Sequence, residues 1–241
     1  PTVVENVQIL RLVGREGTNE EHEPQYEFSL SFDQLSPYAV MEILELNDAQ
    51  QTRYLEAYDV AKHIMMQLSL YPKVWNEETQ KQIFELDELE DGYPQLTLEK
   101  MYWVVRTIAE LVSGNEDESI READFNRNES KFRKLLKDRK NSFSKHPASW
   151  RTVQGALSKL LRLKIFDNAD KKPDYTQITN AGQVTIIDLS DTTSPQINNL
   201  VITELLRGIQ EQQENNYNTA QKDGIDAPRV VIMIEEAHEF L

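Results

Sequence analysis

Hydrophobic and polar positions follow a strand-like pattern near the start of the chain. Residues 7–14, VQILRLVG, form a short and largely apolar run, and residues 26–32, YEFSLSF, alternate strictly between apolar and polar positions. The stretch between them, REGTNEEHEP, is polar and contains glycine, which is typical of a loop. The pattern predicts two strands, which form either a β-hairpin or two neighbouring edge strands.

Helical periodicity replaces this pattern in the middle of the chain. Ser36 followed by Pro37 is an N-cap and first-turn signal, and Thr97 is a second N-cap candidate. The helix after Thr97, LEKMYWVVRTIAELV, is apolar over much of its circumference, so we expect it at the centre of a helical bundle. The predicted helices span residues 38–46, 48–70, 98–112, 119–143 and 148–164.

Short apolar runs return after Asp167. Residues 183–190, QVTIIDLS, predict a buried strand, and Ser194 with the following proline caps a helix expected over 196–213. A polar loop rich in Asn and Gln then precedes five consecutive apolar residues, 230–234, which predict a strand buried on both faces. A strand, a helix and a strand in this order form a βαβ unit with parallel strands.

These elements predict the α/β class, with an α/β frame at both ends of the chain and a large helical bundle inserted between them. We expect residues 1–33 to be a β segment of the frame and residues 34–166 to be the bundle. Residues 167–241 are expected to form the βαβ unit that completes the frame.

Composition indicates a soluble globular protein. The chain has 241 residues, of which 39% are hydrophobic and 28% charged, and no stretch approaches the roughly 18 apolar residues of a membrane span. It also lacks an apolar signal sequence, so we expect a cytoplasmic protein without a membrane partner. The absence of cysteine excludes disulfides and thiolate metal sites, and the four histidines lack metal-ligand spacing.

The net charge of −15 is unevenly distributed along the sequence. Residues 131–164 contain eleven Lys or Arg and one acid, Asp138, a net charge of +10, so the remainder of the chain carries −25. One interpretation is a solvated face that balances acidic neighbours such as residues 85–91. The alternative is a face that contacts phosphates or the acidic rim of a neighbouring subunit.

Two adjacent carboxylates, Glu235 and Glu236, directly follow the apolar run 230–234. A buried parallel strand holds its carboxyl end rigidly at the ligand-binding edge of an α/β sheet. An acid at that point can orient hydrated Mg²⁺, and a second acid can position the water that attacks a phosphate. This is the form of a Walker B element, although an apolar strand that ends in polar surface residues gives the same pattern.

Four stretches together resemble one family of motor proteins. In order, they are LSFDQLSP followed by a helical insertion, then ALSKLLRLKIF, then GQVTIIDLS with its helix LVITELLRGIQ, and finally VVIMIEEAH. This order is similar to that of the HerA-like ATPases, DNA-translocating P-loop motors related to FtsK and the conjugation ATPases. The EEAH tetrapeptide is also similar to the DEAH box of superfamily 2 helicases, but no other motif of that family is present.

The resemblance implies a RecA-like P-loop ATPase core that uses ATP and Mg²⁺. It makes Glu235 the Walker B acid near Mg²⁺ and Glu236 the catalytic acid that activates water. Asp188, at the end of its strand, is a candidate for the nucleotide edge of the sheet or for capping the next turn. The family further implies a hexameric DNA translocase or helicase that acts on double-stranded DNA with a nuclease or other effector partner, in some cases in antiviral defence.

A phosphate-binding loop of the form GxxxxGK[ST] is absent, since none of the eight glycines is followed by lysine. In the family this loop precedes the region of resemblance, and the arginine finger follows it. We therefore expect an internal piece of a longer ATPase that is inactive alone. The alternative is a non-catalytic interaction module, whose helical bundle docks a partner subunit and whose α/β part is scaffold.

Overall fold

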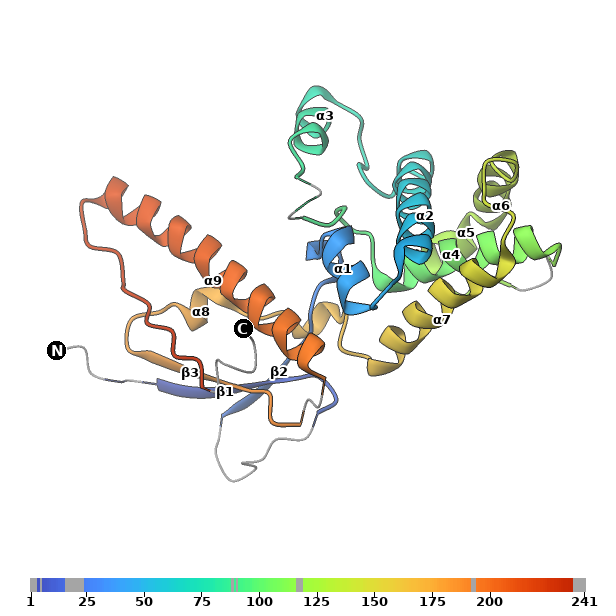
Figure 1. The fold of residues 1–241 in the computed structure, drawn as a ribbon. Coiled ribbons are helices and arrows are strands. Elements are labelled where there is room, and N and C mark those ends of the chain that lie inside the picture. The colour runs from blue at the N-terminus through green and yellow to red at the C-terminus, as the bar shows by residue number, and fades with distance from the viewer. Residues whose placement is uncertain are drawn as a thin grey trace. The chain divides into compact units, whose positions relative to one another are not determined.

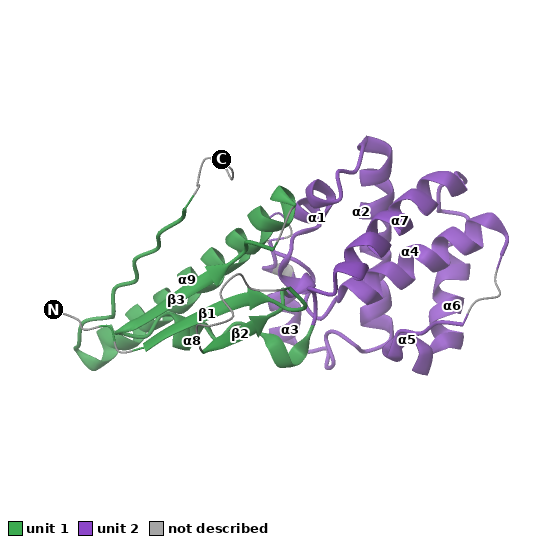
Figure 2. Ribbon diagram, turned by 90° about the horizontal axis from the view of Figure 1, so that it is seen from below, with its two compact units in different colours: residues 1–30, 168–241 green, residues 31–167 purple. Residues whose placement is uncertain are grey.

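The computed structural model describes residues 4, 6–15, 24–87, 89, 91–115, 119–191 and 194–235. They form helices and a small parallel sheet, so the protein belongs to the α/β class, as predicted. The chain divides into two compact units, which Figure 2 shows in different colours. We call them the sheet unit, Pro1–Leu30 with Asn168–Leu241, and the helical unit, Ser31–Asp167.

The sheet unit contains three strands, β1 (Asn6–Leu12), β2 (Gln25–Phe28) and β3 (Gln183–Asp188). Their order is β2-β1-β3, and β1 pairs in parallel with both neighbours. The first two strands are therefore neighbours, as predicted, but β1 is the central strand and, of the two, only β2 is an edge strand. The β-hairpin alternative is wrong, because the two strands are parallel. Parallel neighbours need a crossover of about a dozen residues or more, and residues 13–24 provide one of that length.

Helices α8 (Tyr175–Ile178) and α9 (Pro195–Asp223) of the sheet unit lie on one side of the sheet (Figure 1). The unit also contains the short helix η2 (Ala169–Lys171). On one face of the sheet Leu10, Leu12 and Phe28 are buried, whereas the opposite face keeps apolar residues exposed by 38 to 48%: Val7, Val184 and Ile186. Parallel sheets are usually covered on both faces. Here the face that carries these three residues is open around them, although Ile9 on the same face is buried.

Helix α9 is longer than the sequence pattern indicated. The prediction ended it near residue 213, because the following stretch is polar and rich in Asn and Gln. That stretch contains no glycine or proline before Gly224, so nothing in it breaks the helix. Gly224 has a φ of 67°, and this left-handed residue ends α9 in the usual manner of a C-terminal glycine.

Residues 226–234 are in coil, so the predicted final strand over 230–234 is absent from the structure. Val231 and Met233 are 84% and 88% exposed. A strand buried on both faces needs a helix layer on each side of the sheet, and only one side is covered within the described ranges. The unit predicted over residues 167–241 therefore contains β3 and α9 without the second strand.

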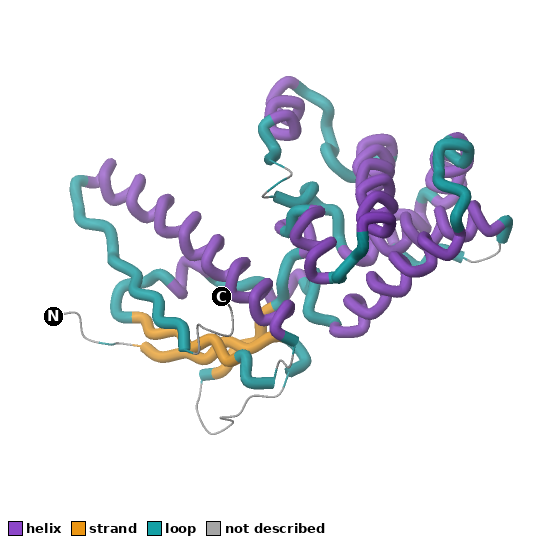
Figure 3. Tube along the Cα trace, in the orientation of Figure 1, coloured by secondary structure: helices purple, strands orange, loops and turns teal. Residues whose placement is uncertain are grey.

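The helical unit is an array of helices (Figure 3). Its centre is α4, which packs against α2 and α7 and buries residues around most of its circumference, so its predicted central place in a bundle is confirmed. The elements are η1 (Phe32–Gln34), α1 (Pro37–Ile43), α2 (Asp48–Gln67), α3 (Glu77–Phe84), α4 (Leu98–Ser113), α5 (Ala123–Arg127), α6 (Glu129–Asp138) and α7 (Pro147–Leu163).

Two elements of this unit differ from the prediction. The single helix expected over 119–143 is two helices, α5 and α6, because Asn128 between them leaves the helical conformation at φ −121° and ψ 26°. Helix α3 was not predicted, since its stretch is charged and weakly patterned. It begins with a capping box, in which the side chains of Asn76 and Thr79 each accept a hydrogen bond from the other residue's backbone N–H.

Candidate functional site

The carboxyl edge of the sheet is the first candidate site. All three strands are parallel, so β1, β2 and β3 end at the same edge, at Leu12, Phe28 and Asp188. In the sheet, β2 lies on one side of β1 and β3 lies on the other side, so the two connections along the chain run in opposite directions across the sheet. In open parallel sheets, ligands bind outside the strand ends where the order reverses in this way. That point lies here at the ends of β1 and β3.

Asp188 is the last residue of β3 and lies beside Arg11 in the strand register. Its Oδ1 accepts hydrogen bonds from the backbone N–H of Ser190, at 3.0 Å, and from the Ser190 hydroxyl, at 2.6 Å. The structure thus shows Asp188 capping the turn after β3, one of the two roles considered from the sequence. Its second role, at the edge that receives a nucleotide, stays a prediction.

Two arginines near this edge were not singled out from the sequence. Arg11 is the second-to-last residue of β1, and Arg15 follows the turn at Gly14, which has a φ of 71°. The Nε atoms of both guanidinium groups are buried and have no hydrogen-bond partner in the described part of the chain. Unsatisfied buried donors are uncommon in folded proteins, so the two groups can serve an anion. The one signal in the sequence is a charged residue inside the strand stretch VQILRLVG.

The two adjacent carboxylates are only partly placed. Glu235 is exposed in a turn after the coil 226–234 and has no hydrogen bond or ion pair with another described residue. Glu236 lies outside the described residues. Mg²⁺ usually keeps several waters and takes one or two protein carboxylates with the phosphates of a nucleotide. Asp188 and Glu235 are suitable ligands by type, but within the described ranges no group of three or more potential ligands converges on one point.

A cavity of about 420 Å³ lies in the sheet unit between β2 and the segment 170–178. The Lys171 ammonium lies 3.5 Å from the Glu27 carboxylate at its wall. The backbone carbonyl of Lys171 accepts a hydrogen bond of 2.7 Å from the Ser29 N–H. The Ser29 hydroxyl in turn accepts one of 3.0 Å from the backbone N–H of Asn168. These contacts connect the end of β2 to the segment after residue 167, which gives the wall a structural role.

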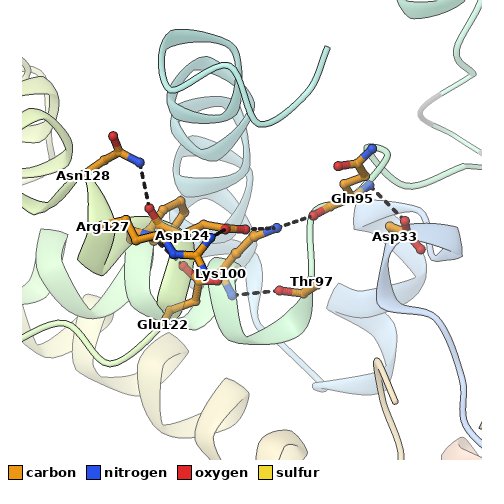
Figure 4. A network of polar contacts seen from close by, with 9 residues as sticks. Asp33, Gln95, Thr97, Lys100, Glu122, Asp124, Arg127 and Asn128 are labelled. Atoms are coloured by element: carbon orange, nitrogen blue, oxygen red, sulfur yellow. Dashed lines mark hydrogen bonds and ion pairs between the residues drawn. The ribbon is translucent and has the colours of Figure 1, made fainter. Parts of the chain in front are cut away.

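A second cavity, of about 350 Å³, lies in the helical unit at the start of α4. Figure 4 shows the polar network beside it, which centres on Lys100. Lys100 is only 7% exposed, and its ammonium lies 3.1 Å from the Asp124 carboxylate and donates to the backbone carbonyl of Gln95 at 3.0 Å. The hydroxyl of Thr97 accepts a hydrogen bond of 3.2 Å from the backbone N–H of Lys100.

Two further carboxylates of this cavity cap the starts of helical segments. Glu122 is 8% exposed and accepts a hydrogen bond of 2.7 Å from the N–H of Phe125 at the start of α5. Asp167 accepts hydrogen bonds from the N–H groups of Leu98, at 2.8 Å, and Phe32, at 2.9 Å. Burial raises the pKa of the Glu122 and Asp167 carboxyl groups, and these backbone hydrogen bonds offset part of the rise.

The network is explained by these helix starts, which otherwise leave backbone N–H groups without partners. Perturbed pKa values beside a cavity also occur at catalytic sites, but every carboxylate named here already has a structural partner. Sequence reasoning missed the network, because its members lie far apart along the chain. The only visible signal is Lys100 inside the apolar helix LEKMYWVV.

Comparison with known proteins gives no relative for this chain: no family model, no curated protein and no solved structure matches it significantly. In addition, none of the helices described is both long and apolar enough to cross a membrane.

Proposed function

We propose that the chain is part of an ATP-hydrolysing DNA translocase of the HerA type, with a RecA-like core interrupted by the helical unit. The observation that carries this proposal is the carboxyl edge of the parallel sheet. There β3 ends in Asp188 beside β1 and is followed by the long helix α9, and the chain then continues into the apolar run before Glu235 and Glu236.

Each acid has a separate role in this proposal. Glu236 would orient the water that attacks the γ-phosphate and accept its proton. Glu235 would hold Mg²⁺, and Asp188 is a further carboxylate at a strand end. Mg²⁺, when bound, would supply charge neutralisation of the phosphates. The guanidinium groups of Arg11 and Arg15, with their unsatisfied Nε donors, add positive charge at the same edge.

The open face of the sheet also supports the proposal. Val7, Val184 and Ile186 expose apolar surface there, and a parallel sheet of an ATPase core is covered on both faces. Further parts of such a core would bury this surface. The implied assembly is a cytoplasmic homo-oligomer, a hexamer by the resemblance, that acts on double-stranded DNA together with a nuclease or other effector protein.

The substitution Glu236→Gln in the protein encoded by the complete reading frame tests this proposal. The amide keeps the size of the side chain but cannot accept the proton, and general-base catalysis contributes about 10²- to 10⁴-fold to a rate. We expect ATP turnover to fall by about 100-fold or more while ATP binding persists. Glu239→Gln, the same change three residues away, should leave turnover unchanged. Normal turnover in Glu236→Gln would refute the assignment.

A second candidate function is a non-catalytic interaction module. It is favoured by the absence of a GxxxxGK[ST] loop from these 241 residues, because that loop supplies the backbone nest and the lysine that hold the phosphates. In this case the helical unit docks a partner subunit and the sheet unit is scaffold. Lack of Mg²⁺-dependent ATP hydrolysis by the complete protein would favour this candidate over the ATPase.

A further inference from the structure

One stretch of the helical unit contains basic residues but no acidic residue. Residues 139–166 contain seven Lys or Arg and no Asp or Glu. Elsewhere in this unit cations are commonly paired, for example Lys62 with Asp59 at 2.8 Å and Arg133 with Glu129 at 2.8 Å. None of the seven cations in 139–166 forms an ion pair with another residue that the structure describes. These cations therefore have no direct carboxylate partner among the described residues, although the Arg151 guanidinium donates a hydrogen bond of 3.4 Å to the Ser113 hydroxyl.

Helix α7 arranges three of these cations on one exposed face. At 3.6 residues per turn, Arg151, Lys159 and Arg162 fall within about 80° of the helix circumference, and all three are exposed. We call this set the α7 stripe. The opposite face holds the buried core residues of the helix: Trp150, Val153, Leu157 and Leu160.

The surface along the α7 stripe is open. Gly155 lies on the same face, between Arg151 and Lys159, and a Cβ atom built at Gly155 would meet no other atom within 4 Å. Arg151 and Arg162 are eleven positions apart, which at 1.5 Å per residue is about 16 Å along the helix. The stripe is thus a straight cationic surface with no bulky residue at its centre.

The stability of α7 itself does not account for these charges. Lys159 and Arg162 are like charges at i and i+3, which repel each other on a helix surface. The helix contains no acid that could pair with them or favour its N-terminus. Only Arg162, in the last turn, is placed favourably for the helix dipole.

We propose that the α7 stripe binds the phosphate backbone of a nucleic acid. Guanidinium and ammonium groups are the side chains that bind phosphates. Each strand of duplex DNA carries one phosphate per about 3.4 Å of the duplex axis, so a stripe of about 16 Å parallel to that axis spans about five phosphates of one strand. Acidic surface of the same protein weakens this attraction little where it lies more than about 10 Å away, because salt screens it at about 0.1 M. The inference does not depend on the ATPase proposal.

A matched pair of triple variants tests the α7 stripe. The first is Arg151→Gln with Lys159→Gln and Arg162→Gln. The control is Lys73→Gln with Lys81→Gln and Lys222→Gln, which removes the same total charge from other exposed positions. Binding to a fluorescein-labelled duplex of random sequence is measured by anisotropy without nucleotide, at about 50 to 200 mM salt.

We expect the wild type and the control to bind with a steep salt dependence. The stripe variant should bind about tenfold more weakly or worse at about 100 mM salt. Its slope of log K against log[salt] should be smaller by about 2.7, because each lost phosphate contact removes about 0.9. Unchanged circular dichroism and tryptophan fluorescence would show that the stripe variant is folded.

Three results would overturn the proposal. The first is an absence of duplex binding by the wild type. The second is an equal loss of binding in both triple variants, which would indicate a general effect of net charge. The third is loss of self-association at low salt in the stripe variant with unchanged DNA binding. That result would identify an acidic surface on a second copy of the chain as the partner.

Discussion

The contact between α8 and α9 makes a sharp prediction for the substitution Gly208→Ala. The ring of Tyr175 lies directly on Gly208, and an added Cβ would be 2.1 Å from Cζ and 2.4 and 2.5 Å from the two Cε atoms of that ring. Since Cβ atoms essentially never approach other atoms to under 3.0 Å, the ring has to leave its position. The substitution therefore tests how α8 is held against α9.

The magnitude follows from two opposing contributions to the free energy of unfolding. Complete removal of a buried aromatic side chain costs about 3 to 5 kcal/mol, and the half-buried ring of Tyr175 should account for about 2 to 3 kcal/mol of packing. Replacing glycine by alanine inside a helix raises the free energy of unfolding by about 1 kcal/mol. We expect Gly208→Ala to destabilise the sheet unit by about 1 to 2 kcal/mol.

The two units can be observed separately. All three tryptophans, Trp75, Trp103 and Trp150, lie in the helical unit, so tryptophan fluorescence follows only that unit during urea unfolding. Amide hydrogen exchange in α9 follows the sheet unit. Gly208→Ala should speed exchange in α9 by about 5- to 30-fold, since 1.4 kcal/mol corresponds to tenfold, and leave the fluorescence transition unchanged.

Gly155→Ala in α7 is the matched control. A Cβ at Gly155 meets nothing within 4 Å, so the same substitution should stabilise the helical unit by about 1 kcal/mol. A double-mutant cycle with Tyr175→Ala should give a coupling of about 2 kcal/mol with Gly208→Ala. Unchanged or slower exchange in α9 of Gly208→Ala, or no coupling to Tyr175, would refute the packing described here.

Two further predictions concern the polar network of the helical unit. Asp167→Ala leaves the part-buried N–H groups of Phe32 and Leu98 without partners. This should lower the free energy of unfolding of the helical unit by about 2 kcal/mol, measured by urea unfolding followed by tryptophan fluorescence. Asp138→Ala, at an exposed position, should change this free energy little. Burial raises the pKa of Glu122 above 4.5, so its contribution to stability is complete below that pH and declines as pH rises through the raised value. Glu122→Gln should remove this part of the decline as the pH rises above 4.5. Identical pH profiles of the two proteins would contradict this expectation.

Elements with strong local signals were predictable from the sequence. Helix α7 was expected over 148–164 and spans Pro147–Leu163, because Pro147 suits a first helical turn and the apolar positions repeat at helical spacing. Strand β3 was expected over 183–190 and spans Gln183–Asp188. In α7 the local pattern and the packing agree. For β3 the position was predicted correctly, but the expected burial was wrong, since none of its residues is buried and Val184 and Ile186 are exposed.

The second half of α9 shows where a local pattern fails. It contacts little: among its residues, Ala220 is buried and Asn216 donates a hydrogen bond of 3.1 Å to the hydroxyl of Thr179. Its hydrophobic signal is correspondingly weak, although nothing before Gly224 stops the helix. The strand predicted over 230–234 was wrong for the opposite reason. An apolar run predicts that a segment is buried, but it does not show which surface buries it.

The candidate sites show a similar division. The position of Asp188 at a strand end could be predicted, because strand boundaries are visible in the sequence. The orphan Nε atoms of Arg11 and Arg15, and the pairing of Lys100 with Asp124, could not be predicted. They depend on which distant segments are packed together, and composition and spacing carry no information about that.

The proposed ATPase is best tested by ATP hydrolysis of the complete protein, with Glu236→Gln compared with Glu239→Gln in the presence and absence of duplex DNA. We expect hydrolysis that depends on Mg²⁺ and increases with DNA. It should fall by about 100-fold or more in Glu236→Gln and be retained in Glu239→Gln. Nucleotide binding should be similar in both variants. Equal hydrolysis by the two variants, or none by the unmodified protein, would contradict the account.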